Sequence, residues 1–312
     1  METHLAQFIN HAWGSIGKDG TYPPFFPGPQ PISIERRHFK HFKNEYYACE
    51  KTDGVRIALV CLEINGTKHC CTVDRAMKFQ PVVFKSIGKR AYNGTILDGE
   101  MVTTKDGKTM FMVYDAVLIC GENVKGSNFK DRLDKIKIFI KSIMKMKSDP
   151  FLIKLKTFYN MSDIHKLVEK IKCDDFEYKN DGLIFTPVRD PIRIGTHETM
   201  FKWKPRDMNT IDFIVKNRQD GTIGLYVQEK GEMVFYTLIK PDQITAEWRD
   251  LLVDNTIVEC KFLDNVWPKR WEPTGIRSDK THPNNRRTLN RTMVNIREDI
   301  QLEEFIDLNK QR

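Results

Sequence analysis

The chain has 312 residues, of which 40% are hydrophobic and 29% are charged, and its net charge is +8. This length allows two domains with sizeable cores, and the composition is that of a globular protein. No apolar run reaches the ~18 residues that a membrane span needs, and the N-terminus lacks a basic-then-apolar signal, so we expect an intracellular protein without a membrane partner. The positive charge favours a polyanionic partner.

The first two thirds of the chain predict strands followed by helices. A proline-rich segment at 21–34 precedes a series of strands over 46–119, in which Asn65-Gly66 marks a hairpin turn. Two helices are predicted next, at about 127–147 and 162–172. Two further buried strands are predicted, at 181–188 and 200–205.

Beyond Asp207 the pattern changes to short, closely spaced strands: "TIDFIVKN", "TIGLYVQE", "MVFYTLIK" and "TIVECKFL". Such spacing favours a small β-barrel or sandwich. The tail from residue 289 to 312 is predicted to be helical. The expected organisation is therefore an α+β first domain at 1–207, a β domain at 208–288 and a helical tail at 289–312.

The stretch "CEKTDGVRIALV" at 49–60 places Lys51 at the lip of a predicted buried strand, beside Asp53 and Arg56. A lysine amine has a reference pKa of ~10.4 and is almost entirely protonated at pH 7. It becomes a nucleophile only beside other cations or in a desolvated site. Lys51 is therefore either a surface lysine at a strand end or a residue placed to attack a nucleotide α-phosphate.

An attack on a nucleotide needs cations for the phosphates, carboxylates for a divalent metal and an aromatic face for the base. Candidates for each role occur, most of them at predicted strand ends. Each candidate alone is more often a turn residue or a solvated surface charge, and only the ordered set indicates a site. The set comprises Arg56, Arg75, Glu100, Tyr114, Asp181, Lys202, Lys204, Arg277, Asp279 and Lys280.

In chain order, KxDGxR, DGE, YDA, DGLIF, FKWKP and RSDK resemble the motifs of the covalent nucleotidyltransferase superfamily, which contains mRNA capping guanylyltransferases and ATP-dependent nucleic-acid ligases. The form is that of the capping enzymes, and "EKTDGVR" and "GIRSDK" are most similar to the stand-alone capping enzymes of large DNA viruses such as the chlorella viruses. The similarity extends from about Phe26 to the C-terminus. It implies an ATP-grasp-like nucleotidyltransferase domain of antiparallel sheets and helices, a C-terminal OB-fold barrel, and a tail that packs back on the first domain.

The resemblance also implies an activity, mRNA guanylyltransfer. Lys51 forms a covalent lysyl-GMP intermediate from GTP and passes GMP to 5′-diphosphate RNA, which yields a GpppN cap. The implied catalytic residues besides Lys51 are Lys202 and Lys204, at the α-phosphate, and Arg277, Asp279 and Lys280, which help pyrophosphate to leave.

The same resemblance implies a nucleotide-binding set and a metal site. Tyr114 stacks on guanine, Arg56 and Arg75 contact the sugar, and Lys156 is a weaker candidate for reading the guanine edge. Glu50 and Thr52, which flank Lys51, belong to the nucleotide-binding set. Asp181 and Glu100 are the carboxylates expected to hold Mg²⁺ or Mn²⁺.

The implied partners are GTP, diphosphate-ended RNA, and a separate RNA triphosphatase and cap methyltransferase, with the chain itself a monomer. A viral factory in the cytoplasm and the host nucleus both fit the sequence. An ATP-dependent DNA or RNA ligase is the alternative, because it shares the lysine chemistry; the "RSDK" ending favours capping. A catalytically inactive RNA-binding module is a second alternative, and the intact KxDG and the motif lysines argue against it.

Overall fold

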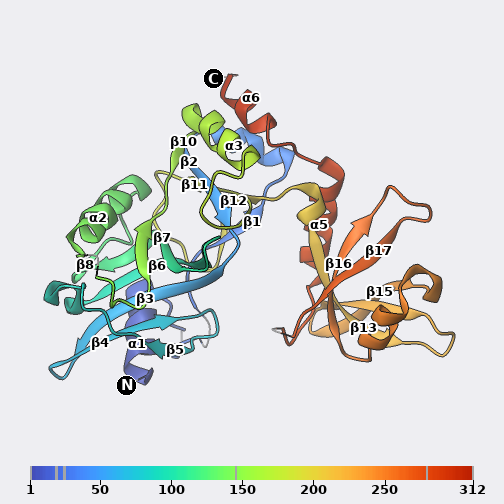
Figure 1. The fold of residues 1–312 in the computed structure, drawn as a ribbon, viewed down its shortest axis with the longest axis horizontal. Coiled ribbons are helices and arrows are strands. Elements are labelled where there is room, and N and C mark those ends of the chain that lie inside the picture. The colour runs from blue at the N-terminus through green and yellow to red at the C-terminus, as the bar shows by residue number, and fades with distance from the viewer. Residues whose placement is uncertain (1, 18–19, 24–25, 145, 279, 311–312) are drawn as a thin grey trace. The chain divides into compact units, whose positions relative to one another are not determined.

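The computed structural model describes residues 2–17, 20–23, 26–144, 146–278 and 280–310. The chain forms two compact units (Figure 1). The first unit contains Met1–Ile32, Phe39–Trp203 and Glu303–Arg312, and the second contains Ser33–His38 and Lys204–Leu302. No helix within the described residues is long and apolar enough to cross a membrane.

A seven-stranded sheet forms the larger part of the first unit, in the order β5-β4-β3-β6-β7-β8 with β9 paired to β7. Its strands pair antiparallel, except that β9 runs parallel to β7. The strands are β3 (Val55–Ile64), β4 (Thr67–Val73), β5 (Phe79–Pro81), β6 (Thr95–Thr103), β7 (Thr109–Ile119), β8 (Glu122–Asn123) and β9 (Leu152–Leu155).

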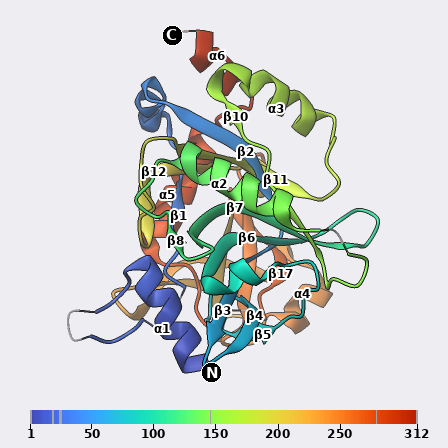
Figure 2. The same cartoon turned by 90° about the vertical axis from the view of Figure 1, so that its left-hand side faces the viewer.

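Helices cover both faces of this sheet (Figure 2). Leu59 and Cys61 of β3 belong to the core that includes α2 (Phe129–Ser142), whereas Ala58 and Val60 belong to the core that includes α1 (Glu2–Trp13). A strand buried on both faces reads as a continuous apolar run, which explains the sequence "RIALVCL". The predicted hairpin turn that follows has Asn65 and Gly66 at φ 50° and 77°.

A second sheet of the first unit carries the candidate nucleophile. Its strand order is β1-β12-β11-β2-β10. The strands are β1 (Gln30–Ser33), β2 (Tyr46–Thr52), β10 (Tyr159–Asn160), β11 (Asn180–Pro187) and β12 (Thr196–Trp203). α3 (Ile164–Lys172) and α6 (Glu304–Lys310) belong to the same unit.

The second unit is a five-stranded antiparallel sheet in the order β15-β14-β13-β16-β17. Its strands are β13 (Thr210–Asn217), β14 (Ile223–Glu229), β15 (Glu232–Ile239), β16 (Ile257–Leu263) and β17 (Arg270–Ile276), and its helices are α4 (Ala246–Leu251) and α5 (Arg286–Glu298). Short 3₁₀ helices occur in both units, at Arg36–Lys43, Lys89–Asn93, Met161–Asp163, Arg206–Met208 and Pro241–Gln243. The α+β class with a C-terminal β domain is confirmed.

The expected C-terminal tail is divided between the units. Leu289, Met293 and Ile296 of α5 are buried in the core of the β domain, so this helix belongs to the second unit. Phe305 of α6 packs in the first unit, with its ring centroid 4.8 Å from that of Phe185. β17 is absent from the strands predicted from the sequence, and it contains Pro273, a residue that is unusual in a strand. An edge strand with an irregular register tolerates such a proline, and β17 has both features.

Candidate functional site

Lys51 of β2 faces a bulge in the neighbouring strand β11. The ladder pairs Thr52 with Asn180 and Glu50 with Leu183, so Asp181 and Gly182 both lie opposite Lys51. Such a bulge redirects the side chains at its centre. Here it brings the Asp181 Oδ1 atom to 2.6 Å from the Lys51 Nζ atom, and the two side chains are 16% and 23% exposed.

The dipeptide Asp181-Gly182 explains why the bulge forms at this position. Gly182 has a φ of 149°, a conformation that residues with a Cβ atom rarely adopt. Gly182 therefore allows the bulge, and the bulge places the Asp181 carboxylate beside Lys51.

Lys51 lines a cavity of about 140 Å³ in the first unit. Its wall combines apolar, aromatic and charged side chains, the mixture that small-molecule sites use. Six residues predicted from the sequence line it: Lys51, Arg56, Arg75, Glu100, Tyr114 and Lys156.

Lys156 is buried against β2, the strand that carries Lys51. Its Nζ atom donates to the Glu50 carbonyl oxygen at 2.7 Å and to the Thr52 Oγ1 atom at 3.1 Å. Burial acts to lower the pKa of Lys156, but the nearby Glu50 and Glu100 carboxylates act to raise it, and the pKa lies above its ordinary value, so its ammonium stays charged. The Thr52 hydroxyl in turn donates to the Glu100 carboxylate.

Glu50 and Thr52 support the cavity wall without lining it. Both are buried, and the Glu50 Oε1 atom accepts from the Tyr178 hydroxyl at 2.9 Å. Their side chains hold Lys156 and Glu100 in place.

Arg56 and Tyr114 converge on a buried acid, Asp98. The Arg56 guanidinium donates from Nε at 3.1 Å and from Nη2 at 2.6 Å to the two Asp98 carboxylate oxygens. The Tyr114 hydroxyl donates to Asp98 Oδ1 at 3.0 Å. A two-point interaction with a fully buried carboxylate fixes the orientation of the guanidinium plane. Burial raises the pKa of Tyr114 well above its ordinary value, so the hydroxyl remains a donor at neutral pH.

Two further ionisable residues line the cavity, Cys49 and Asp115, and contacts within the protein account for both. Burial raises the pKa of Cys49 to about 12, so its thiol is neutral. Asp115, next to Tyr114, accepts from Arg132 Nε at 2.7 Å and from Nη2 at 2.9 Å. This ion pair ties α2 to β7 beneath the cavity.

Lys202 of β12 belongs to the same sheet as Lys51 and lies on the side of that sheet that faces the cavity. In the register, Lys202 pairs with Ile184, and Ile184 pairs with Cys49. Directly paired residues point to the same side of a sheet. Because Cys49 and Ile184 line the cavity, the Lys202 side chain is directed to that side too.

The remaining motif cations belong to the second unit. Lys204 follows β12. Arg277 Nη1 donates to Asp212 Oδ1 at 3.0 Å, and Lys280 Nζ bonds the other oxygen of the same carboxylate. Asp279, which the resemblance groups with these two cations, lies outside the described residues. Asp212 binds both cations.

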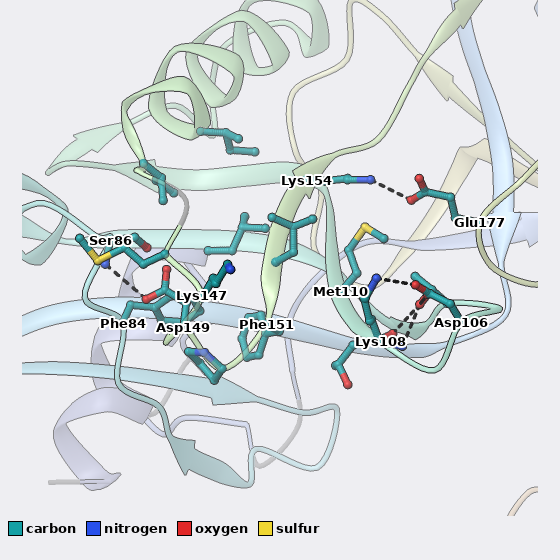
Figure 3. A pocket seen from close by; sticks show the side chains of 18 of the residues that line it. Phe84, Ser86, Asp106, Lys108, Met110, Lys147, Asp149, Phe151, Lys154 and Glu177 are labelled. Atoms are coloured by element: carbon teal, nitrogen blue, oxygen red, sulfur yellow. Dashed lines mark hydrogen bonds and ion pairs between the residues drawn. The ribbon is translucent and has the colours of Figure 1, made fainter.

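Another cavity of the first unit, of about 830 Å³, contains none of the predicted site residues (Figure 3). Its charged side chains are largely paired with one another. Lys154 Nζ lies 2.8 Å from Glu177 Oε2, and Lys108 Nζ lies 2.5 Å from Asp106 Oδ2. Asp149 Oδ1 accepts the Lys85 backbone N–H at 2.9 Å. This cavity is therefore a weaker candidate for a site that must attract phosphates.

The carboxylates near Lys51 fit a divalent cation that shares its coordination with a substrate. In the part of the chain that the structure describes, no three His, Cys, Asp or Glu residues form a metal-binding group. Asp181 contacts Lys51, and Glu100 lines the cavity. One or two carboxylates plus phosphate oxygens is the usual arrangement for Mg²⁺.

The α+β fold, with a lysine and carboxylates at a basic cavity and a separate C-terminal β domain, defines a nucleotidyltransferase. Comparison with known families identifies which one. The model described as "mRNA capping enzyme, catalytic domain" matches residues 2–206, and that described as "mRNA capping enzyme, C-terminal domain" matches residues 208–306. The chain therefore belongs to the mRNA capping enzyme family and is a guanylyltransferase.

Individual relatives agree with this family. The mRNA-capping enzyme subunit alpha of Schizosaccharomyces pombe is 32% identical over 92% of this chain and 80% of that protein. The mRNA-capping enzyme of Danio rerio is 29% identical over 83% of this chain, which spans 45% of the length of that relative. A mycobacterial DNA ligase D structure covers 81% of this chain and 95% of its own, at a TM-score of 0.45 and 12% identity, and this likeness carries no argument about activity.

Two residues that the sequence analysis did not single out are Asp98 and Asp212. Both are acids that directly follow an apolar residue within a strand, Leu97 in β6 and Ile211 in β13. An acid in such a strand is buried only with a partner, and that pattern was the available signal. It does not identify the partner, which in both cases comes from a distant part of the chain.

Proposed function

We propose that Lys51 is the nucleophile that carries GMP between GTP and RNA. The contact between Lys51 and Asp181 at the cavity wall is the observation that carries this proposal. It places a carboxylate against an amine that lines a cavity, and the other charged residues of the cavity wall include Arg56, Arg75 and Lys156.

In the first half-reaction the neutral Lys51 amine attacks the α-phosphorus of GTP. A phosphorus–nitrogen bond forms, the nitrogen gives up one proton to the solvent, the bond to the β-phosphate oxygen breaks, and pyrophosphate leaves. In the second, a terminal phosphate oxygen of 5′-diphosphate RNA attacks the same phosphorus. The phosphorus–nitrogen bond breaks and the nitrogen takes up one proton from the solvent, which regenerates the Lys51 amine and yields GpppN.

The cavity wall supports roles for the nucleotide-binding residues. The Tyr114 ring stacks on guanine, because an aromatic face at a cavity wall suits a base. We assign Lys156 to the guanine edge because it is a cation of the cavity wall; its Nζ atom is held by the Glu50 carbonyl and the Thr52 hydroxyl and lies 3.6 Å from Glu50 Oε1. Arg56 and Arg75 contact the sugar.

Lys202 and Lys204 bind the α-phosphate in this proposal, and Arg277 and Lys280 act on the departing pyrophosphate. The direction of Lys202 toward the cavity face supports its role. Asp212 competes with phosphate for Arg277 and Lys280, because its carboxylate binds both cations.

Asp181 and Glu100 hold Mg²⁺ or Mn²⁺ together with phosphate oxygens. The metal, when bound, neutralises charge on the phosphates during the transfer. The oxygen ligands suit either ion.

Incubation with α-labelled GTP or ATP and a divalent metal, followed by a denaturing gel, tests the function. We expect a covalent label from GTP that pyrophosphate removes and diphosphate-ended RNA accepts. A label from ATP alone would instead support the ligase alternative.

The RNA triphosphatase that generates the diphosphate end and the cap methyltransferase are separate proteins in this proposal. Both matched domains are accounted for by guanylyltransfer, and the Schizosaccharomyces pombe relative is itself named as a subunit. Capping of triphosphate-ended RNA should therefore require an added triphosphatase.

A further inference from the structure

The second unit contains a cavity that none of the sequence motifs occupies. Its volume is about 380 Å³. Three rings and three cations contribute to its lining, and no aspartate or glutamate does so among the described residues. They are Tyr236, Phe262 and Trp271, and Lys240, Lys269 and Arg270.

The cavity lies where the sheet of the β domain ends. β15 and β17 are the two edge strands of that sheet, and each contributes residues to the lining. Edge strands present backbone N–H and C=O groups without ladder partners. The cavity is thus bordered by two sheet edges as well as by side chains.

Of the aromatic residues that line the cavity, one is buried in the core and two are partly accessible. Trp271 is 4% exposed, and its ring centroid lies 5.1 Å from that of Phe262. Phe262 and Tyr236 are only partly buried against this core. Next to the cavity, Trp267 is 91% exposed and directly precedes the lining residue Pro268. A tryptophan with this exposure makes little contribution to the folded core, so its large apolar face is available to a ligand.

The cations that line the cavity have no acidic partner among the described residues, whereas a neighbouring lysine has one. Within the described residues, Lys240, Lys269 and Arg270 form no ion pair, whereas Lys261 on β16 lies 2.9 Å from Glu272. Arg270 Nε is buried and has no hydrogen-bond partner in the described chain. A buried N–H without an acceptor costs free energy, which a ligand phosphate could recover.

We propose that this surface binds single-stranded RNA. Bases stack on Trp267 and on the partly buried rings, and phosphates accept hydrogen bonds from Lys240, Lys269 and Arg270. Aromatic faces interleaved with unpaired cations are the means by which proteins bind single strands of any sequence. The inference rests on the proposed function only in taking RNA to be the acceptor substrate.

Binding is tested with a 5′-hydroxyl RNA of about 12 nucleotides, within the range of about 4–16 that one OB fold covers. This probe cannot accept GMP, so its binding is independent of catalysis. We expect the RNA to quench tryptophan fluorescence. Trp267→Ala should lower affinity by about 5- to 150-fold, the equivalent of about 1–3 kcal/mol for one base stack. Trp267→Phe should retain most of the affinity and lose most of the fluorescence change.

Lys269→Ala should weaken RNA binding and make it less sensitive to salt. The slope of log affinity against log salt should fall by about 0.7 for each phosphate that the protein no longer neutralises. Lys261→Ala is the matched control, because that lysine is already paired with Glu272, and it should bind as the unmodified chain does. Equal affinities for the unmodified chain, Trp267→Ala and Lys269→Ala would overturn the proposal. Equally effective competition by tripolyphosphate would overturn the stacking component.

A kinetic comparison separates this inference from the proposed function. The Trp267 and Lys269 variants should form lysyl-GMP at the normal rate, raise KM for long diphosphate-ended RNA, and leave KM for a diphosphate-ended dinucleotide unchanged. Failure of the unmodified chain to form lysyl-GMP would count against the proposed function alone. An unchanged KM for long RNA in both variants would count against the RNA surface alone.

Discussion

The Lys51 Nζ atom and the Asp181 Oδ1 atom lie 2.6 Å apart across a bulge in β11 that includes Gly182. The contact depends on backbone geometry, since Asp181 and Gly182 together oppose a single residue of β2. A change in the bulge should therefore displace the carboxylate without altering any charged group.

Gly182→Ala tests this dependence. Gly182 has a φ of 149°, so a Cβ atom there forces the bulge to relax. We expect lysyl-GMP formation to slow by at least about tenfold, of the order expected for a misplaced reacting group. Gly107→Ala is the control: Gly107 also has a positive φ, 80°, but lies in the turn between β6 and β7. It should lose stability and keep a normal rate of adduct formation.

Lys51→Arg should abolish the acid-labile, base-stable GMP adduct. A guanidinium remains protonated in proteins and cannot act as the nucleophile, although it preserves the charge beside Asp181. Labelling with α-labelled GTP followed by a denaturing gel measures the adduct. Lys154→Arg, at a lysine paired with Glu177, should label normally. A normal yield from Lys51→Arg would contradict the assignment of the nucleophile.

Tyr114 has two separable parts, a ring at the cavity and a hydroxyl bonded to Asp98 at 3.0 Å. In Tyr114→Phe the Asp98 carboxylate keeps its two hydrogen bonds from Arg56, so we expect a small loss of stability and a near-normal KM for GTP. Tyr114→Ala should weaken GTP binding by about 1–3 kcal/mol. If both variants raised KM equally, the stacking role would be wrong.

The Tyr114 site also shows what the sequence could and could not predict. The motif residues Lys51, Arg56 and Tyr114 were identified because their order and spacing are local properties of the chain. Asp98 was missed because its importance comes from Arg56, 42 residues away, across the β3–β6 pair. Pairing of this kind depends on strand register, which a single sequence specifies only weakly.

The same distinction holds in the second unit. Its four strongly apolar strands were predicted, whereas β17 was missed because its edge position and register irregularity, which allow Pro273, are tertiary features. Asp212 was missed as the partner of Arg277 and Lys280 for the reason that applies to Asp98. The continuous run in β3 was identified as buried, but the identity of the two helices that cover it was not.

Arg277→Ala and Lys280→Ala should impair the first half-reaction more than the second. Both residues act on pyrophosphate in our proposal, and that group is absent once lysyl-GMP has formed. We expect little adduct from GTP, and a near-normal rate of GMP transfer to diphosphate-ended RNA from any protein isolated already guanylylated. Lys261→Ala should leave both steps unchanged. Equal losses in both steps would contradict a role confined to pyrophosphate departure.

His197 should make stability depend on pH. It is 2% exposed on β12, and burial, assisted by the nearby Arg193, lowers its pKa from 6.5 to about 4. The unfolded chain therefore takes up a proton near pH 6.5, whereas the folded chain does so only near pH 4. The stabilising effect of keeping this histidine neutral is present above pH 6.5 and is lost as the pH falls toward 4. By pH 5 the loss should be on the order of 2 kcal/mol.

The measurement that checks this is urea unfolding, followed by circular dichroism, at several pH values between 7 and 5. His197→Gln retains a polar side chain within reach of Thr199, whose Oγ1 atom lies 3.3 Å from His197 Nδ1 in the unmodified chain. Because the variant keeps every other histidine, the difference between the two curves isolates His197. The free energy of unfolding of the unmodified chain should fall more steeply with decreasing pH than that of the variant. Parallel curves would show that His197 takes up its proton at the same pH in the folded and the unfolded chain.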